Sequence, residues 1–141
     1  MVVNDGQNQR SRVTKVRVPA ADYPDGAVLV RVTGDPMKVI PTGQVVGPDL
    51  VLTFATDPQC EHGSLPDGRW AVVPLKGHFH RLFGDSSGDA TVDSTDFLDF
   101  ANTYGLSSSS PEFNAAFDGN ADGTIDSTDW LDFTNRYGVT I

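Results

Sequence analysis

Hydrophobic and polar positions alternate with a period of two through much of the first eighty residues. Four short segments rich in β-branched and aromatic residues show this alternation most clearly: 13–18, 28–33, 50–54 and 70–73. Turn sequences that combine proline, aspartate and glycine separate these segments. A spacing of about 8–12 residues between turns is typical of a small antiparallel sandwich or barrel. In the second segment we expect Val28, Val30 and Val32 to share one face.

The last sixty residues show hydrophobic positions at helical spacing instead. Two short amphipathic helices are predicted from the sets Phe97, Phe100, Ala101, Tyr104 and Trp130, Phe133, Thr134, Tyr137. Gly105 and Gly138 follow these sets and favour helix ends. Ser110 and Pro111 form a typical helix start, so we expect a third short helix that ends near Phe117. We expect the aromatic residues to form a core rather than a binding surface.

Residues 85–105 and 118–138 are two copies of one sequence. They align at an offset of 33 residues with 13 of 21 positions identical. Such close similarity indicates one structural unit used twice.

The net charge of −9 belongs to this repeated part of the chain. Residues 81–141 carry 11 acidic and 2 basic residues, whereas residues 1–80 carry 8 of each. The acidity argues against nucleic-acid binding, which needs a basic face. No apolar run approaches the ~18 residues that span a bilayer, and the N-terminal residues show no charged-then-apolar leader. The single cysteine, Cys60, excludes an internal disulfide framework.

Each repeat opens with twelve residues that carry oxygen side chains at positions 1, 3, 5, 9 and 12. This pattern, with a main-chain carbonyl at position 7, is that of an EF-hand calcium loop. Four carboxylates within twelve residues repel one another unless a divalent cation lies among them. We therefore predict two Ca²⁺ ions. The predicted ligands are Asp85, Ser87, Asp89, the Thr91 carbonyl, Asp93 and Asp96, and then Asp118, Asn120, Asp122, the Thr124 carbonyl, Asp126 and Asp129.

Two features set these loops apart from the usual pattern. Position 12 is aspartate instead of glutamate in both loops, and position 6 is Gly123 in the second loop but Ala90 in the first. A positive φ at Ala90 should cost ~1 kcal/mol or more, so we expect the first site to be weaker. At position 8, Val92 and Ile125 favour a short β-bridge between the loops.

Helix capping is an alternative role for these aspartates that is compatible with metal binding. Asp93 and Asp126 are good N-caps, with Asp96 and Asp129 in the first helical turns. In the first half, Cys60, His62, His78 and His80 could supply zinc ligands. Their spacing is not that of known structural sites, so we expect ordinary loop and surface roles. No catalytic constellation is recognisable, and we expect no enzyme activity.

Two short segments of the first half carry a family resemblance: residues 9–14 before the first strand and residues 64–70 before a late one. On these segments, the first half resembles immunoglobulin-like β-sandwich modules of secreted bacterial proteins. The second half resembles a type I dockerin, on Gly84-Asp85-x-x-Gly88-Asp89 and Asp118-x-Asn120-x-Asp122-Gly123. We therefore expect an α+β fold in two parts. Residues 1–81 would form a small antiparallel Ig-like β-sandwich, and residues 82–141 an α-helical dockerin-like module with paired calcium loop–helix motifs.

The dockerin resemblance implies a function and a partner. It implies a non-catalytic, calcium-dependent module that anchors a secreted protein to a cohesin-like partner, in an extracellular or cell-surface assembly concerned with polysaccharides. Loop positions 10 and 11 imply partner contacts at Ser94, Thr95, Ser127 and Thr128. We expect a monomer. The alternative is a calcium-stabilised structural tail with no cohesin partner; a calcium sensor is disfavoured, because entering helices and a Met-rich groove are missing.

Overall fold

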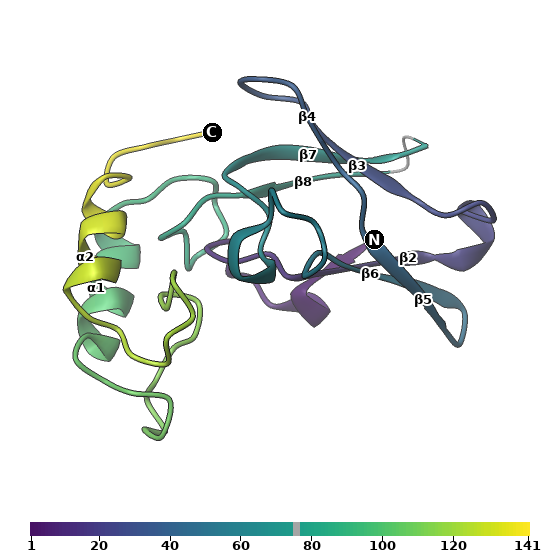
Figure 1. The fold of residues 1–141 in the computed structure, drawn as a ribbon. Helices are drawn as coiled ribbons and strands as arrows, with labels where there is room; N and C mark the ends of the chain where they lie inside the picture. Colours follow the sequence, from purple (N-terminus) through teal and green to yellow (C-terminus); the bar gives the residue numbers. More distant parts are fainter. Residues whose placement is uncertain (75–76) are drawn as a thin grey trace. The chain divides into compact units, whose positions relative to one another are not determined.

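The computed structural model describes residues 1–74 and 77–141 of the chain. These residues divide into two compact units. The first unit contains Met1–Gln7 and Val13–Arg81, and the second contains Asn8–Arg12 and Leu82–Ile141. Figure 1 shows the strands of the first unit and the two helices of the second. The second unit is therefore discontinuous in sequence, since it includes five residues from near the N-terminus.

The first unit contains two four-stranded antiparallel sheets. One sheet has the order β1-β2-β6-β5 and the other β4-β3-β7-β8. The strands are β1 (Val2–Val3), β2 (Lys15–Pro19), β3 (Val28–Arg31), β4 (Met37–Val39), β5 (Thr42–Val46), β6 (Asp49–Thr53), β7 (Gly68–Val73) and β8 (Gly77–Arg81). Three short 3₁₀ turns complete the unit at Asn4–Gly6, Ala20–Asp22 and Glu61–Gly63.

Both sheets contribute side chains to one hydrophobic core. Val16 and Val18 of β2 and Leu52 of β6 come from the first sheet, whereas Leu29 of β3 and Trp70 of β7 come from the second. Each fully buried side chain of this kind contributes ~1.5–3 kcal/mol. The alternation predicted for residues 50–54 is confirmed, because Leu50, Leu52 and Phe54 are all buried.

Strand β3 buries the face opposite to the one that Val28 and Val30 share. Leu29 is fully buried, while Val28 and Val30 are half-buried and Val32 is exposed. The period of two was read correctly, but Val28, Leu29 and Val30 are all apolar, so the sequence could not show which face lies against the core. The Ig-like classification of this unit stays a prediction.

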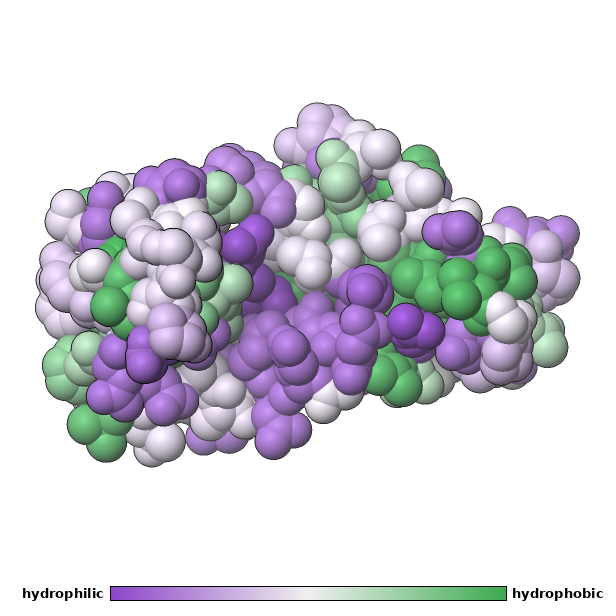
Figure 2. Space-filling model, turned by 90° about the horizontal axis from the view of Figure 1, so that it is seen from below, coloured by the Kyte–Doolittle hydropathy of each residue, from purple (hydrophilic) through white to green (hydrophobic). Residues whose placement is uncertain are grey.

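Hydrophobic side chains also remain on the surface of the first unit. Strand β5 is exposed at every position, and Val45 is 65 % exposed. Figure 2 shows a hydrophobic patch over the strand-containing part of the molecule, beside strongly hydrophilic surface. Cys60, in contrast, is buried, and its burial raises the pKa of the thiol to about 11.

The second unit contains helices α1 (Ser94–Thr103) and α2 (Ser127–Thr134). Its core is a separate cluster of Leu82, Phe83, Val92, Phe100, Phe117, Ile125 and Phe133. Phe100 and Phe133 connect the helices, with ring centroids 4.9 Å apart. In the part of the chain that the structure describes, neither helix is long and apolar enough to cross a membrane.

The predicted α+β fold class was wrong. Within residues 1–74 and 77–141, α-helix is confined to the ten residues of α1 and the eight of α2, beside two four-stranded sheets. The chain is therefore mainly β, and its acidic unit consists mostly of loops and turns rather than being an α-helical module.

The third predicted helix, from Ser110 to near Phe117, is a series of turns. The Asn114 N–H binds Thr103 Oγ1 at 2.9 Å, and the Asn114 side chain accepts the Ala116 N–H at 3.1 Å. Because asparagine side chains compete for main-chain groups in this way, they interrupt the hydrogen-bond ladder of a helix. The start signal at Ser110 and Pro111 was real, but no helix continues from it.

Candidate metal centre

The first and last carboxylates of each predicted loop are buried. Asp85 and Asp96 in the first loop and Asp129 in the second have no exposed surface, and Asp118 is 5 % exposed. The side chains at positions 3 and 5 lie at the surface or only half-buried. Buried carboxylates are rare unless they are paired, hydrogen-bonded or bound to a metal. The four carboxylates at the loop ends therefore need hydrogen-bond partners or a cation.

In the first loop, main-chain N–H groups surround both buried carboxylates. Asp85 accepts the N–H groups of Gly88 at 2.6 Å and Ala90 at 3.0 Å. Asp96 accepts those of Ser86, Ser87 and Asp93 at 2.9–3.0 Å. The main chain of the loop is thereby hydrogen-bonded to the side chains of its first and last residues.

The second loop repeats this arrangement at the equivalent positions. Asp118 accepts the N–H groups of Asp122 and Gly123, and Asp129 accepts those of Gly119 and Asp126, at 2.8–3.1 Å. Because both copies fold alike, the pattern of oxygen residues, and not a chance contact, determines the loop geometry.

Asp93 and Asp126 cap the two helices, as the sequence predicted. Each side chain accepts the N–H of the residue two positions later, Thr95 or Thr128, at 2.7 Å. A capping box completes each start, since Asp96 and Asp129 accept the N–H of the capping residue in return. An N-cap of this kind stabilises a helix by ~1 kcal/mol. The alternative capping role is therefore present in both loops.

Each loop holds one alanine in the left-handed region. Ala90 at position 6 of the first loop has φ +72°, and Ala121 at position 4 of the second has φ +58°. At the equivalent positions of the other repeat, Gly123 corresponds to Ala90 and has φ +86°, and Gly88 corresponds to Ala121 and has φ +81°. The predicted weakness of the first site rested on strain at Ala90 alone. Because both loops carry one strained alanine, backbone strain does not separate them.

Burial and neighbouring carboxylates disfavour the charged form of Asp129 at the end of the second loop. Burial raises the pKa of Asp129, and the nearby carboxylates of Asp118 and Asp126 raise it further, against the lowering effect of two main-chain hydrogen bonds. In contrast, the exposed Asp122 has a lowered pKa because Thr124 and Asn120 donate hydrogen bonds to it. A cation among these oxygens would remove the repulsion at Asp129.

The donor chemistry fits a hard divalent cation. Side-chain and main-chain oxygens at these twelve positions are the ligands that Ca²⁺ prefers, and no nitrogen or sulfur ligand is involved. Among the residues described, however, no three His, Cys, Asp or Glu side chains are grouped so that they could hold a metal ion. The carboxylates accept main-chain N–H groups instead. The ligand set thus remains a proposal supported by loop path and donor type.

The loops are joined crosswise to the segments that follow the helices. Thr91 of the first loop forms a β-bridge with Thr140, after α2, and Thr124 of the second with Ser107, after α1. The flanking hydrogen bonds repeat as well: Gly138 N–H donates to the Val92 carbonyl, and Gly105 N–H to the Ile125 carbonyl. The predicted loop–loop bridge at position 8 is replaced by these contacts with the opposite repeat.

The four predicted partner-contact residues are exposed at the helix starts. Ser94 and Thr95 begin α1, and Ser127 and Thr128 begin α2. One turn further, Leu98 and Leu131 are 64 % and 60 % exposed. Sequence reasoning missed these two leucines. The signal for them was present, because each is identical in both repeats and lies away from the buried Phe of its helix.

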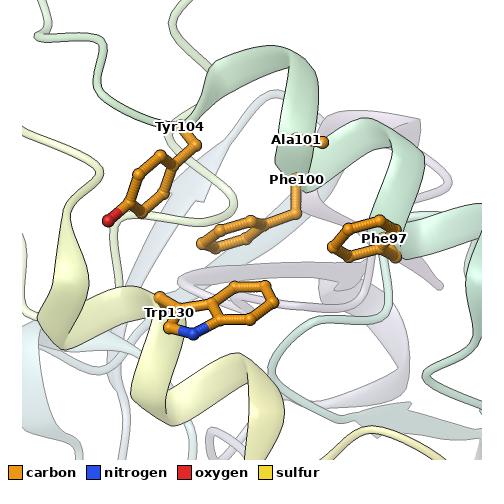
Figure 3. A pocket seen from close by; sticks show the side chains of 5 residues that line it. All are labelled: Phe97, Phe100, Ala101, Tyr104 and Trp130. Carbon is orange, nitrogen blue, oxygen red and sulfur yellow. The ribbon is translucent and has the colours of Figure 1, made fainter.

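Aromatic side chains line an open pocket between the helices. Phe97, Phe100, Ala101 and Tyr104 approach it from α1 and its C-cap, and Trp130 approaches it from α2, as Figure 3 shows. Phe97 and Trp130 are 38 % and 39 % exposed. The predicted core role is thus correct for Phe100 and Phe133, whereas the outer aromatics are accessible to solvent.

The cysteine and histidine residues of the first unit do not form a metal site among the residues described. Cys60 is buried, while His62 and His78 are exposed. Their burial differs because Cys60 belongs to the hydrophobic core. The expected surface positions hold for His62 and His78, whereas Cys60 lies in the core.

The geometry defines a doubled acidic loop–helix unit, and comparison with known families identifies its sequence pattern. Residues 83–136, less than half of the chain, match the family model of the Dockerin type I domain. No curated protein matches the chain. Two crystal structures of interface mutants of a type II cohesin–X–dockerin complex from Acetivibrio cellulolyticus are similar to it. Each has 13 % identity, coverage of 90 % of this chain and 97 % of the other, and a TM-score of 0.41.

Proposed function

We propose that the acidic unit is a non-catalytic, calcium-dependent docking module that binds a cohesin-like partner. One observation carries this proposal: the segment that matches the type I dockerin model, 83–136, is also the segment in which both acidic loops fold around buried carboxylates. The domain assignment, with residues 82–141 as the docking part and 1–81 as a separate domain, is part of the proposal.

Two Ca²⁺ ions would be held by the ligand sets given above, one in each loop. The ion supplies positive charge at buried oxygens, which offsets the two causes that raise the pKa of Asp129: its burial first, and then the neighbouring carboxylates of Asp118 and Asp126. The chain contributes prearranged loop ends, because Asp96 and Asp129 also fix the first turns of the helices. Ion binding would therefore stabilise α1 and α2 directly, in line with the coupling of metal binding and folding in small modules.

The exposed helix starts are the proposed partner contacts. Ser94 and Thr95 on α1 correspond to Ser127 and Thr128 on α2 through the 33-residue repeat. Two equivalent faces would allow one partner to bind in either of two orientations. The exposed Leu98 and Leu131 extend these faces by one turn.

The setting that we propose follows from the dockerin match. A docking module of this type would serve an extracellular or cell-surface assembly, concerned with polysaccharides, and would itself carry no catalytic group. Its binding would be that of a monomer to its partner. A calcium-stabilised structural tail without a cohesin partner is the alternative, and the partner experiment below separates the two.

The ion requirement is tested by calcium titration of the full chain. Isothermal calorimetry measures ion binding, and far-UV circular dichroism measures helicity. We expect two bound ions, and a loss of helicity and faster proteolysis within residues 85–138 after chelation. Asp118→Asn should weaken the second site by about tenfold or more, because it replaces a carboxylate ligand. Asp132→Asn is the matched control, because Asp132 lies on α2 outside the loop, half-buried beside Arg136. Absence of calcium binding by the wild-type protein would refute the proposal.

The partner is tested by capture of cohesin modules from the same source on the immobilised chain, with calcium or with chelator. We expect retention only with calcium. Replacement of both Ser94 and Thr95 by alanine should preserve binding through the second face, whereas replacement of all four contact residues should abolish it. Calcium binding without retention of any cohesin would favour the structural-tail alternative.

A further inference from the structure

Five residues from near the N-terminus are built into the acidic unit. We call Asn8–Arg12 the strap. It belongs to the same compact unit as Leu82–Ile141, although about seventy residues of chain separate the two segments. The strap lies outside residues 83–136, the segment that matches the family model.

The Ser11 hydroxyl joins the entrances of both loops. Ser11 is fully buried. Its Oγ donates to the Ala116 carbonyl at 2.6 Å and accepts the Gly84 N–H at 2.8 Å. Gly84 immediately precedes Asp85, and Ala116 lies two residues before Asp118. A single side chain therefore ties together the two points at which the chain enters the loops.

The neighbours of Ser11 bind the main chain of the two first loop residues. The Arg10 N–H donates to the Asp85 carbonyl at 2.8 Å, and the Arg12 guanidinium donates to the Asp118 carbonyl at 2.8 Å. Asp85 and Asp118 are equivalent positions of the two repeats. The strap thus makes a corresponding contact with each copy, one on either side of Ser11.

The strap also explains a difference between the repeats. Position 4 has a positive φ in both loops but is Gly88 in the first and Ala121 in the second. A Cβ on Gly88 would lie 2.1 Å from the Asn8 carbonyl oxygen, which no real contact permits. The second loop accepts alanine at this position, so backbone conformation alone does not demand the glycine. The passage of the strap beside the first loop demands it.

We propose that the strap is part of the ion-binding unit and that Ser11 is a positioning residue for both calcium sites. This inference rests on the proposed calcium function. Hydrogen bonds from the strap fix the main chain at Gly84, Asp85 and Asp118 before an ion is bound. Loss of the Ser11 hydroxyl leaves two buried main-chain groups without that partner, and the loop entrances then move independently. Both sites weaken together, although Ser11 lies in neither loop.

The test is calcium titration of the full chain, monitored by NMR at the loop amides so that the dissociation constant of each site is measured separately. Ser11→Ala should weaken each site by about fivefold, because each loop entrance loses one buried hydrogen bond, at Gly84 for the first loop and at Ala116 for the second. Ser64→Ala is the matched control, because Ser64 is a buried serine of the first unit whose Oγ accepts the Val13 N–H at 3.1 Å. Its two dissociation constants should equal those of the wild type.

A second pair consists of one variant that displaces the strap, with Ser11 unchanged, and its control at the equivalent position of the other repeat. Gly88→Ala should weaken the first site by about tenfold or more, since the Asn8 carbonyl must shift. Ala121→Gly changes the equivalent position, where no strap passes, and should leave the first site unchanged. A residue that only stabilised the fold would lower the melting temperature of Ser11→Ala without changing the dissociation constants of the folded protein.

The outcomes distinguish this inference from the proposed function. Wild-type titration without calcium binding would overturn the function and the inference with it. Normal wild-type binding, with unchanged dissociation constants in folded Ser11→Ala and in Gly88→Ala, would overturn the inference alone. Weakening of both sites by Ser11→Ala, and of the first site by Gly88→Ala, would support it.

Discussion

Phe133→Ala is the substitution that should most strongly destabilise the acidic unit. Phe133 is 1 % exposed, and its ring lies 4.9 Å from that of Phe100 and 6.1 Å from that of Phe117. The unit has a core cluster of only seven buried residues. Removing the central ring therefore opens a cavity that a small core cannot refill.

The size of the effect follows from burial and ring contacts. Phe→Ala in a core costs about 3–5 kcal/mol, and a folded unit of about 65 residues has a stability of about 3–10 kcal/mol. We expect the loss to approach the whole stability of the unit at low calcium. Phe97→Ala is the matched control. Its ring is 38 % exposed, so we expect a loss of about 1 kcal/mol.

Each unit contains one tryptophan, which allows the two units to be observed separately. Trp70 is fully buried in the first unit, and Trp130 lies on α2 in the second. Denaturant unfolding is followed by fluorescence in a Trp70→Phe background for the second unit and in a Trp130→Phe background for the first. We expect Phe133→Ala to shift the Trp130 midpoint and to leave the Trp70 midpoint in place. A loss below about 1 kcal/mol, or an equal shift of both midpoints, would refute this reasoning.

Two further predictions concern the loops. Ala121→Gly should stabilise the metal-free second unit by about 0.5–1 kcal/mol in denaturant unfolding, since it relieves a positive φ at an exposed position; no gain would contradict the strain argument. In chelator, the raised pKa of Asp129 contributes stability that is fully present below its unfolded pKa and is lost as pH rises through the folded value, so the metal-free second unit should become less stable over that rise. Saturating calcium should abolish this loss; unfolding curves of the second unit from acid to neutral pH, in chelator and in calcium, check it, and an equal loss in both would contradict it.

Much of the candidate site was predictable because its signals are local. The capping role of Asp93 and Asp126, the start of each helix and the twelve-residue loop pattern depend on side chains a few positions apart. The strand periods were also local and were read correctly at Leu50 and Leu52. Prediction failed where local signals conflicted with partners elsewhere in the chain. The helix predicted over residues 110–117 does not form there, and the Thr103 hydroxyl accepts a hydrogen bond from the N–H of Asn114.

The sequence by itself determined the repeat, the concentration of negative charge in residues 81–141 and the alternation that makes the first half β-rich. These properties follow from residue types and spacings within short windows. The tertiary structure alone decided which face of residues 28–31 is buried, how each loop bridges the opposite repeat, and that Asn8–Arg12 completes the acidic unit. The reason is physical, because nothing in the sequence around Ser11 indicates a hydrogen-bond partner 105 residues away. Only the folded chain brings Ser11 Oγ to 2.6 Å from the Ala116 carbonyl oxygen.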